Sequence, residues 1–460
     1  MENLEKFETT NRFLLFSIFM PMSSVWTIYS FPMLVSSFSV GQTCTNSTDC
    51  IAAPGSLSED FNLTGSRSNL GDFSTSAFMI GCVFGAVLVP RFADLKGRKP
   101  LLIFGMFMLG LLGCASAFSV SIYMFIVLRC LQGVFFPTNG IISFVLAYES
   151  LPRKLRDYAA LVFGMLWVTG YCIVGPVAYF LPNWRHLMLA CSIPSIFSSI
   201  AYWIVVPESF HFMMSKKMEP QLDKWLNKAN KTKTIVTVNA KTLIAEHMRS
   251  LLRDSNRDRN LIVQLCTHKK LLLYIVVLSY LWLTDTMLYY GLSLYSSDLA
   301  GNKYVNYVLS GLIEVPSYLI SPYLLNKMGR RLFVGSSHLL AAVAFLILIF
   351  VEHSTVVLVL WLIAKFGISC SFTSLFIYAS ELFPTTVRSG CIGICEILAR
   401  IGGSISPLVH SIGQTYTWLP GIFFTVVAAI AGFVTFVLPE TRDQNLPDTT
   451  LEVVGVQESS

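Results

Sequence analysis

Signatures of catalysis are missing from this chain of 460 residues. It contains no GxxxxGK[ST] phosphate loop, no HExxH, no GxSxG, and no CxxC or Cys/His spacing of a metal site. These absences argue against an enzyme, a resident cofactor or metal, and a primary ATP-driven pump. Charge is also scarce, because Asp, Glu, Lys and Arg make up only 13% of the residues while 54% are hydrophobic. Such a composition excludes an ordinary soluble globular protein.

Long apolar runs dominate the sequence instead. A hydrocarbon layer about 30 Å thick needs roughly 20 apolar residues per helix, and twelve runs of that size occur. We therefore predict an all-α membrane protein with twelve transmembrane helices. The runs cover residues 13–36, 72–92, 100–119, 121–147, 156–181, 185–206, 269–298, 303–326, 332–352, 355–380, 386–412 and 416–438.

Lysine and arginine gather in alternate turns between these runs. The basic turns follow the second, fourth, sixth, eighth and tenth runs, whereas the other turns carry almost none. By the positive-inside rule, the basic turns and both termini face the cytoplasm. Glu2, Glu5 and Glu8 precede the first run, so we expect no cleavable signal.

One group of turn residues recurs at a constant offset of 232 positions. Residues 94–99 read Asp-Leu-Lys-Gly-Arg-Lys, and residues 326–331 read Asn-Lys-Met-Gly-Arg-Arg. The same offset relates Pro207-Glu208 to Pro439-Glu440. An ungapped repeat of this kind indicates two six-helix pseudo-repeats. The turn residues are candidates for gating or conformational roles: Asp94, Gly97, Arg98, Lys99, Glu149, Arg156, Gly329, Arg330, Arg331, Glu381 and Arg388.

The repeat predicts four parts. These are an N-terminal bundle at 1–206, a cytoplasmic linker at 207–268, a C-terminal bundle at 269–442 and a cytoplasmic tail at 443–460. The linker mixes basic and acidic residues without interleaved aromatics, which favours a solvated face over a nucleic-acid site.

The predicted outside loop spans residues 39–71. It holds glycosylation sequons at Asn46 and Asn62, which are acceptors if the loop is outside and plain polar residues otherwise. Cys44 and Cys50 lie in the same loop. In an oxidising compartment they either form a disulfide or remain free.

Charged residues lie deep inside apolar runs of the second half, and our candidates among them are Asp285, Glu314, Lys365 and Arg400. Charge at such depth is costly and marks candidate functional sites in membrane proteins. We take these residues as candidates for substrate binding. The alternative is that two acids and two bases neutralise one another and only fix the packing.

Aromatic residues accompany these charges: Tyr289, Tyr290, Phe372, Phe376 and Tyr378. Phe372 and Phe376 are four residues apart and share one helix face. The rings either pack a core or form a cage for an organic ion through stacking and cation–π contact. Two repeats that meet around buried charges have the layout of an alternating-access transporter.

These residues resemble the major facilitator superfamily, and in finer detail its organic ion transporter family, solute carrier family 22. The superfamily motifs are Asp94…Gly97-Arg98-Lys99, Arg129…Gln132-Gly133, Pro207-Glu208-Ser209 and Gly329-Arg330-Arg331. The finer motifs are Tyr289-Tyr290-Gly291, Glu314-Val315-Pro316, Lys365-Phe366-Gly367, the segment from Tyr378 to Arg388, Ala399-Arg400-Ile401-Gly402-Gly403 and Leu438-Pro439-Glu440-Thr441.

The resemblance implies uniport, exchange or cotransport of small organic cations, anions or zwitterions across the plasma membrane. The coupling partner would be Na⁺, H⁺ or a counter-substrate, and the lipid bilayer is the surrounding medium. The family's cation carriers have Asp at the position of Arg400, whereas its anion and carnitine-type carriers have Arg. The stretch around Glu314 looks like cation and carnitine-type members, with Tyr318 where anion carriers often place Lys. Together the two positions suggest a zwitterion, such as a carnitine-like solute, or another amphoteric ion.

The sequence departs from the family in two places. Pro90 occupies the place of the Gly that begins the family's first turn motif. The outside loop is short, which puts loop-dependent oligomerisation in doubt. A sugar carrier shares the turn motifs, but sugar sites need neutral amides and the seventh run has no Gln pair. A membrane sensor without transport is the other alternative.

Overall fold

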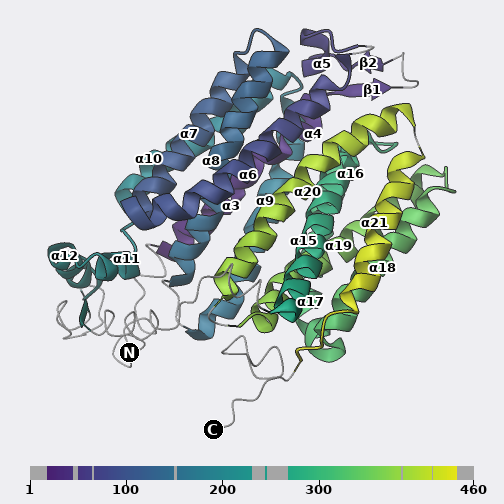
Figure 1. The fold of residues 1–460 in the computed structure, drawn as a ribbon. Helices are drawn as coiled ribbons and strands as arrows, with labels where there is room; N and C mark the ends of the chain where they lie inside the picture. The colour runs from purple at the N-terminus through teal and green to yellow at the C-terminus, as the bar shows by residue number, and fades with distance from the viewer. Residues whose placement is uncertain are drawn as a thin grey trace.

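The computed structural model describes residues 18–44, 50–64, 67–149, 153–230, 244–245, 268–384, 387–416 and 418–442. These residues form a bundle of helices (Figure 1). The predicted tail at 443–460, most of the linker beyond residue 230 and the sequon at Asn46 lie outside the described residues.

Every predicted apolar run contains a helix. Ten described segments are long and apolar enough to cross a membrane, and the shorter α3 and α21 complete the twelve. In the first half the spanning helices are α3 (Met20–Leu34), α6 (Leu70–Lys96), α7 (Arg98–Ala117), α8 (Ile122–Glu149), α9 (Arg153–Phe180) and α10 (Trp184–Val205). In the second half they are α15 (Lys269–Leu294), α16 (Lys303–Leu312) with α17 (Glu314–Met328), α18 (Arg330–Leu348), α19 (Ser354–Leu382), α20 (Arg388–Thr415) and α21 (Leu419–Thr435).

Short helices and strands lie at the two ends of the bundle. Strands β1 (Gln42–Cys44) and β2 (Cys50–Ala52), with α5 (Leu57–Asp60), lie at one end, which we call the loop end (Figure 1). Helices α11 (Phe210–Ser215) and α12 (Glu219–Asn230) lie at the opposite end, which we call the linker end. Both helices fall inside the predicted linker.

The eighth predicted run is interrupted near its middle. α16 ends at Leu312 and α17 begins at Glu314, with Ile313 between them. Pro316 explains the break, because its ring cannot donate a hydrogen bond and clashes with the carbonyl four residues earlier, which is that of Leu312. The break places Glu314 at the first position of a helix inside the bundle.

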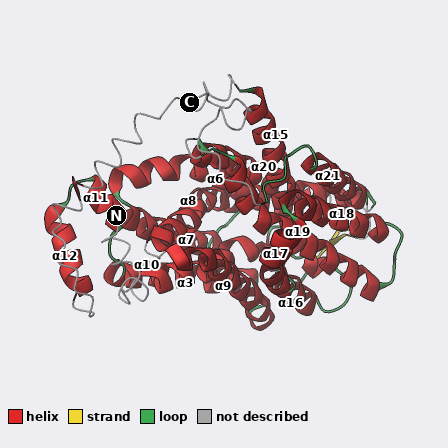
Figure 2. Ribbon diagram, turned by 90° about the horizontal axis from the view of Figure 1, so that it is seen from below, coloured by secondary structure: helices red, strands yellow, loops and turns green. Residues whose placement is uncertain are grey.

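Two seams join the halves of the chain. α6 packs against α20, and α9 packs against α16 and α17. Figure 2, seen from below, shows both pairs side by side between the two groups of helices. Pro90 lies exposed within α6, which continues through it to Lys96, so the helix still forms the first seam.

Gly97 turns the chain between α6 and α7 at the linker end. Its φ of 101° is one that other residues rarely adopt, and an added Cβ would lie 2.8 Å from Oε2 of Glu208. The backbone N–H groups of Arg98 and Lys99 both donate to Oε1 of Glu208, each at 3.1 Å. The carboxylate thus satisfies donors that the start of a helix leaves unpaired.

The second repeat builds the same turn. Gly329 has a φ of 90°, and the N–H groups of Arg330 and Arg331 donate to the two oxygens of Glu440 at 2.8 and 3.1 Å. The guanidinium of Arg330 also donates two bonds of 2.8 Å to Glu381. The recurring turn is therefore a carboxylate-capped helix start. The side chains of Asp94, Glu149 and Arg156 lie outside the described part of the structure.

The loop after α3 contains a small sheet that the sequence does not predict. β1 and β2 are antiparallel, with Cys44 directly opposite Cys50 in the backbone register. Their side chains are not among those described, so the disulfide stays a prediction. Asn62 is exposed in a turn with a φ of 49°.

Candidate functional site

An ion pair lies at the break between α16 and α17. Oε1 of Glu314 is 3.0 Å from Nζ of Lys365 in α19, and neither side chain is exposed at all. The hydroxyl of Tyr318 donates to the other oxygen of Glu314 at 3.0 Å. Two of the four candidate charges are therefore partners, whereas the neutralisation alternative had all four neutralise one another.

Rings and oxygens from α15 surround the ammonium group of Lys365. Its Nζ lies 3.3 Å from the ring centroid of Tyr289 and 3.4 Å from that residue's carbonyl oxygen. It also donates to the hydroxyl of Ser293. Tyr171 of α9 approaches from the other half, with its ring centroid 5.7 Å from Nζ. A desolvated ammonium gains from the negative face of such rings.

A row of contacting aromatic side chains, which we call the aromatic wall, extends from this ion pair across both halves. The indole N–H of Trp167, in α9, donates to the hydroxyl of Tyr289 at 2.7 Å. Tyr289 also contacts Tyr290 edge to face at 5.3 Å and stacks on Phe372 at 5.9 Å between centroids. Phe372 in turn contacts Phe376, which is 40% exposed. The structure thus brings together four of the five predicted aromatics.

Arg400 lies in α20, on the seam with α6. One guanidinium nitrogen is 3.6 Å from a carboxylate oxygen of Glu396, one turn earlier on the same helix. Its Nε is buried and has no hydrogen-bond partner among the described residues. Tyr29 of α3 and Tyr290 of α15 lie within electrostatic reach of the guanidinium. A buried donor without a partner is uncommon and requires an explanation.

Asp285 lies inside the second half, apart from the aromatic wall. Its Oδ1 is 2.9 Å from Nε2 of His338 in α18, and the hydroxyl of Ser371 donates to its Oδ2 at 2.8 Å. Nδ1 of His338 lies 2.9 Å from the carbonyl oxygen of Val334. The cluster joins α15, α18 and α19. The structure does not bring Asp285 to the seam between the halves, and this location favours a packing role.

We predict that Asp285→Ala lowers the thermal midpoint of the purified protein without changing the ion selectivity that the family resemblance implies. The substitution leaves His338 buried without its hydrogen-bond acceptor, and an unsatisfied buried polar group costs about 1–3 kcal/mol. Asp285→Asn should cost less, because an amide can still hydrogen-bond to the imidazole and to Ser371. Thermal unfolding and the ratio of cation to anion uptake measure the two effects. A changed ratio at normal stability would make Asp285 a binding residue.

Tyr378 also lies apart from the aromatic wall. Its hydroxyl donates to the carbonyl oxygen of Pro439 at 2.6 Å, and its ring is in a core with Leu382 and Leu438. This core is near the linker end, beside the turn that contains Glu440. The structure therefore places Tyr378 with the capped turn.

Arg129 of the first half is a buried cation with three hydrogen bonds to protein oxygens. Its guanidinium donates to the carbonyl oxygen of Pro32, to Gln132 and to Ser36 at 2.7 to 2.8 Å. It also lies 4.4 Å from the ring centroid of Phe78. As expected for a charge at that depth, it faces the interior of the protein. It ties α8 to α3 and α6.

Several residues of the site carry no charge, and no feature of the sequence distinguishes them from packing residues. Trp167, Tyr171 and Tyr29 are aromatic residues within apolar runs, where most aromatics only pack. His338 had a usable signal, since an ionisable residue inside an apolar run is uncommon. In the described part of the chain, no group of three or more His, Cys, Asp or Glu could hold a metal ion.

Comparison with known proteins connects this arrangement to a family. The family described as "Sugar (and other) transporter" matches residues 19–450. A Caenorhabditis elegans protein named as a putative transporter is 37% identical over 87% of this chain and 81% of its own length. Organic anion transporter 3 of Oryctolagus cuniculus is 31% identical, and the organic cation transporter protein of Drosophila melanogaster is 27% identical. Each of these two alignments covers 85% of this chain and 72% of the relative.

Solved structures support the same fold. The partially occluded inward-open form of the xylose transporter XylE from Escherichia coli aligns with a TM-score of 0.72, covering 94% of this chain and 99% of XylE at 18% identity. The inward-open form aligns with a TM-score of 0.70. The chain therefore belongs to the sugar (and other) transporter family of the major facilitator superfamily, and its similarity to organic cation and anion transporters identifies it as a transporter of solute carrier family 22.

Proposed function

We propose that this transporter carries small organic ions that bear a carboxylate, either anions or zwitterions, across the plasma membrane by alternating access. The loop end would face outside and the linker end the cytoplasm. The basic turns at Arg98 and Arg330 support this orientation, because positive residues favour the cytoplasmic side. The exposed position of Asn62 at the loop end fits an external glycosylation site.

The buried Nε of Arg400 is the observation that carries the choice of substrate. The guanidinium has one distant acidic contact, at 3.6 Å, and a donor that no described residue uses. A carboxylate can accept two parallel hydrogen bonds from such a fork, which is the strong form of this interaction. Arg400 is therefore suited to receive a carboxylate that enters between the halves.

Glu314 does not offer the matching site for a simple cation. Lys365 already neutralises it, and Tyr318 occupies its second oxygen. A cationic substrate would have to displace one of these partners inside a fully buried site, which is costly. The aromatic wall offers the positive end of a zwitterion another place to bind, because a cation is attracted to the face of an aromatic ring and Tyr290, Phe372 and Phe376 all lie in this wall.

Contacts between the two halves at the loop end support the interpretation that this end is closed. Phe38 of α4 (Ser36–Ser39) stacks on Tyr304 of α16 with centroids 5.5 Å apart. Nearby, the hydroxyl of Ser297 donates to the carbonyl oxygen of Ser37 at 3.0 Å. These contacts join the two halves near the loop end. In an alternating-access cycle they would separate when the transporter opens outward.

An uptake screen tests the proposal. Cells that express the chain at the surface are offered labelled monocarboxylates, zwitterionic ammonium carboxylates, permanent organic cations and a hexose, at clamped membrane potential, with and without Na⁺ and a pH gradient. We expect saturable uptake of at least one carboxylate-bearing ion and little uptake of the hexose. Uptake limited to permanent cations would contradict the role of Arg400. Absence of flux for every compound, with normal surface expression, would contradict transport of these ions.

A further inference from the structure

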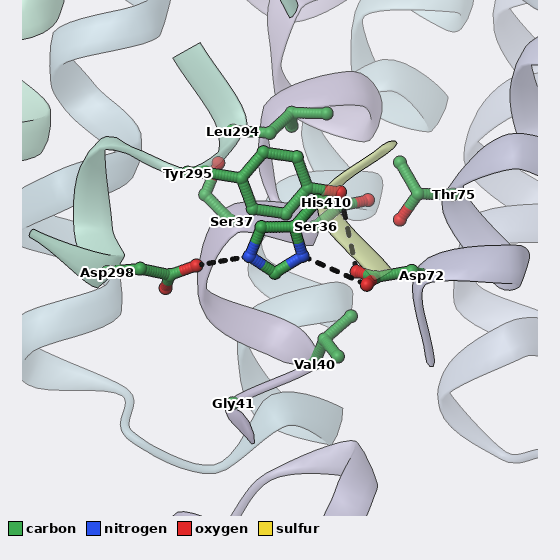
Figure 3. Close-up of a pocket in the computed structure, with 10 residues that line it drawn as sticks. All are labelled: Ser36, Ser37, Val40, Gly41, Asp72, Thr75, Leu294, Tyr295, Asp298 and His410. Carbon is green, nitrogen blue, oxygen red and sulfur yellow. Dashed lines mark hydrogen bonds and ion pairs between the residues drawn. The ribbon is translucent and has the colours of Figure 1, made fainter. Parts of the chain in front are cut away.

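His410 is held between two carboxylates at the loop end (Figure 3). Its Nδ1 lies 2.9 Å from Oδ2 of Asp72, and its Nε2 lies 3.1 Å from Oδ2 of Asp298. The ring of Tyr295 stacks on the imidazole with centroids 3.5 Å apart and planes 9° apart. The hydroxyl of Tyr295 donates to the other oxygen of Asp72 at 3.3 Å.

These distances determine how many protons the cluster holds. A neutral imidazole has one N–H donor and one lone pair, whereas a carboxylate oxygen can only accept. If both aspartates are ionised, a neutral ring would point its lone pair at one of them from about 3 Å. Both nitrogens must therefore carry a proton, or one aspartate must be protonated. In either case the cluster binds one proton beyond neutral His410 with two carboxylates.

The cluster bridges the two halves of the transporter. Asp72 lies in the first turn of α6, in the first half. His410 lies in α20, and Asp298 lies in η3 (Ser296–Asp298) after α15, both in the second half. The remaining neighbours that line the small cavity here are uncharged, among them Ser36, Ser37 and Thr75. The contact between His410 and Asp72 must break when the halves separate at this end.

We propose that the site formed by Asp72, His410 and Asp298 binds a proton that locks the loop end shut. With the proton, His410 attracts both aspartates and holds α6 against α20. Without it, two carboxylates face a neutral ring, and their mutual repulsion favours separation. The loop end therefore opens more readily at high pH. This inference rests on the proposed alternating-access cycle, although the lock itself needs no substrate.

Solvent has a route to the site. The side chain of His410 is 24% exposed and that of Asp298 is 48% exposed, whereas Asp72 is 6% exposed. An unperturbed histidine changes charge between about pH 5 and 8. Two carboxylates beside the ring favour its charged form and move this change to higher pH. The pH of the medium at the loop end therefore sets the state of the lock directly.

Thiol labelling of the full chain in lipid nanodiscs tests the lock. Thr75→Cys places a reporter at a buried position of the cavity, and Val120→Cys, at a residue 85% exposed near the same end, corrects for the ionisation of a thiol. Labelling of the unsubstituted chain gives the background from its own cysteines. We expect the corrected labelling rate of the Thr75→Cys chain to rise about tenfold between about pH 7 and about pH 10, as loss of one charge-assisted contact implies; the window lies above the ordinary histidine range because two carboxylates flank the ring.

Variants of the histidine complete the experiment. His410→Gln combined with Thr75→Cys should label fast at both pH values, and His410→Lys, which keeps a positive charge, should label slowly at both. The matched control is His353→Gln, which changes an exposed histidine at the same end and should behave like the parent. Asp298→Asn is a milder second variant and should flatten the pH response. A parent response that survives in His410→Gln, or no response in the parent, would overturn the proposal. Labelling requires no transport, so failure of the uptake screen leaves this result independent.

Discussion

Replacing Arg400 with aspartate is expected to reduce the uptake of carboxylate-bearing ions by at least about 30-fold, because removing one member of a buried charge pair costs about 2–5 kcal/mol. The new carboxylate would repel the substrate in addition to removing its partner. Uptake of permanent organic cations should be retained or should rise. Initial rates for one carboxylate, one zwitterion and one cation, each normalised to surface expression, measure the effect.

Two further variants make this result specific. Arg400→Lys keeps the charge but loses the planar fork of donors, so we expect intermediate uptake with a raised KM. Arg67→Asp applies the same change to an exposed arginine of the loop and should leave uptake unaltered. If Arg400→Asp transports all three classes in the same proportions as the wild type, Arg400 has a structural role only.

Breaking the ion pair between Glu314 and Lys365 is expected to cause the largest loss of stability. Lys365→Met leaves Glu314 unpaired in a site with no exposure, and removing one partner of such a pair costs about 3–5 kcal/mol. Glu314→Gln leaves the ammonium unpaired in the same way. Thermal unfolding of the purified variants should show a lowered midpoint for each, together with reduced uptake of every substrate.

The double variant Glu314→Gln/Lys365→Met supplies the control. It removes both charges at nearly constant volume, and Tyr318 can still donate to the amide oxygen. We expect it to regain most of the lost stability, which would give a large coupling energy in the double-mutant cycle. Additive losses would show that the two side chains do not stabilise each other. Selective loss of cation uptake in Glu314→Gln, at normal stability, would instead support the role for Glu314 that the sequence suggested.

The sequence predicts the fold well because two strong physical rules apply to it. Membrane helices need long apolar runs, and the recurring Gly-Arg turns repeat with the chain's internal period. Helix breaks are less visible. The interruption at Ile313 depends on Pro316, yet other prolines, such as Pro90, lie inside continuous helices. A proline therefore interrupts one helix and leaves another continuous, and the tertiary packing around it decides which occurs.

The site was predictable only in part, because a sequence shows which side chains are charged but not which of them face each other. Glu314 and Lys365 form an ion pair with each other, whereas Asp285 pairs with His338, a residue that the motifs do not single out. The aromatic wall also includes Trp167, which the sequence did not point to because it lies 122 positions from its hydrogen-bond partner Tyr289. Contacts between the halves depend on how the two repeats meet, and no local pattern records that geometry.

The paired turns at the linker end bear on the mechanics of the transport cycle. Glu208, at the beginning of the predicted linker, and Glu440, at the end of the second bundle, anchor the start of α7 and of α18 at 2.8 to 3.1 Å. Each repeat therefore has a carboxylate-capped helix start at the equivalent turn. When each half moves as one unit, the deformation falls on the contacts between the two halves. We therefore expect the cycle to proceed as a rocking of rigid bodies, whose energy barrier resides in the seams and in the lock around His410.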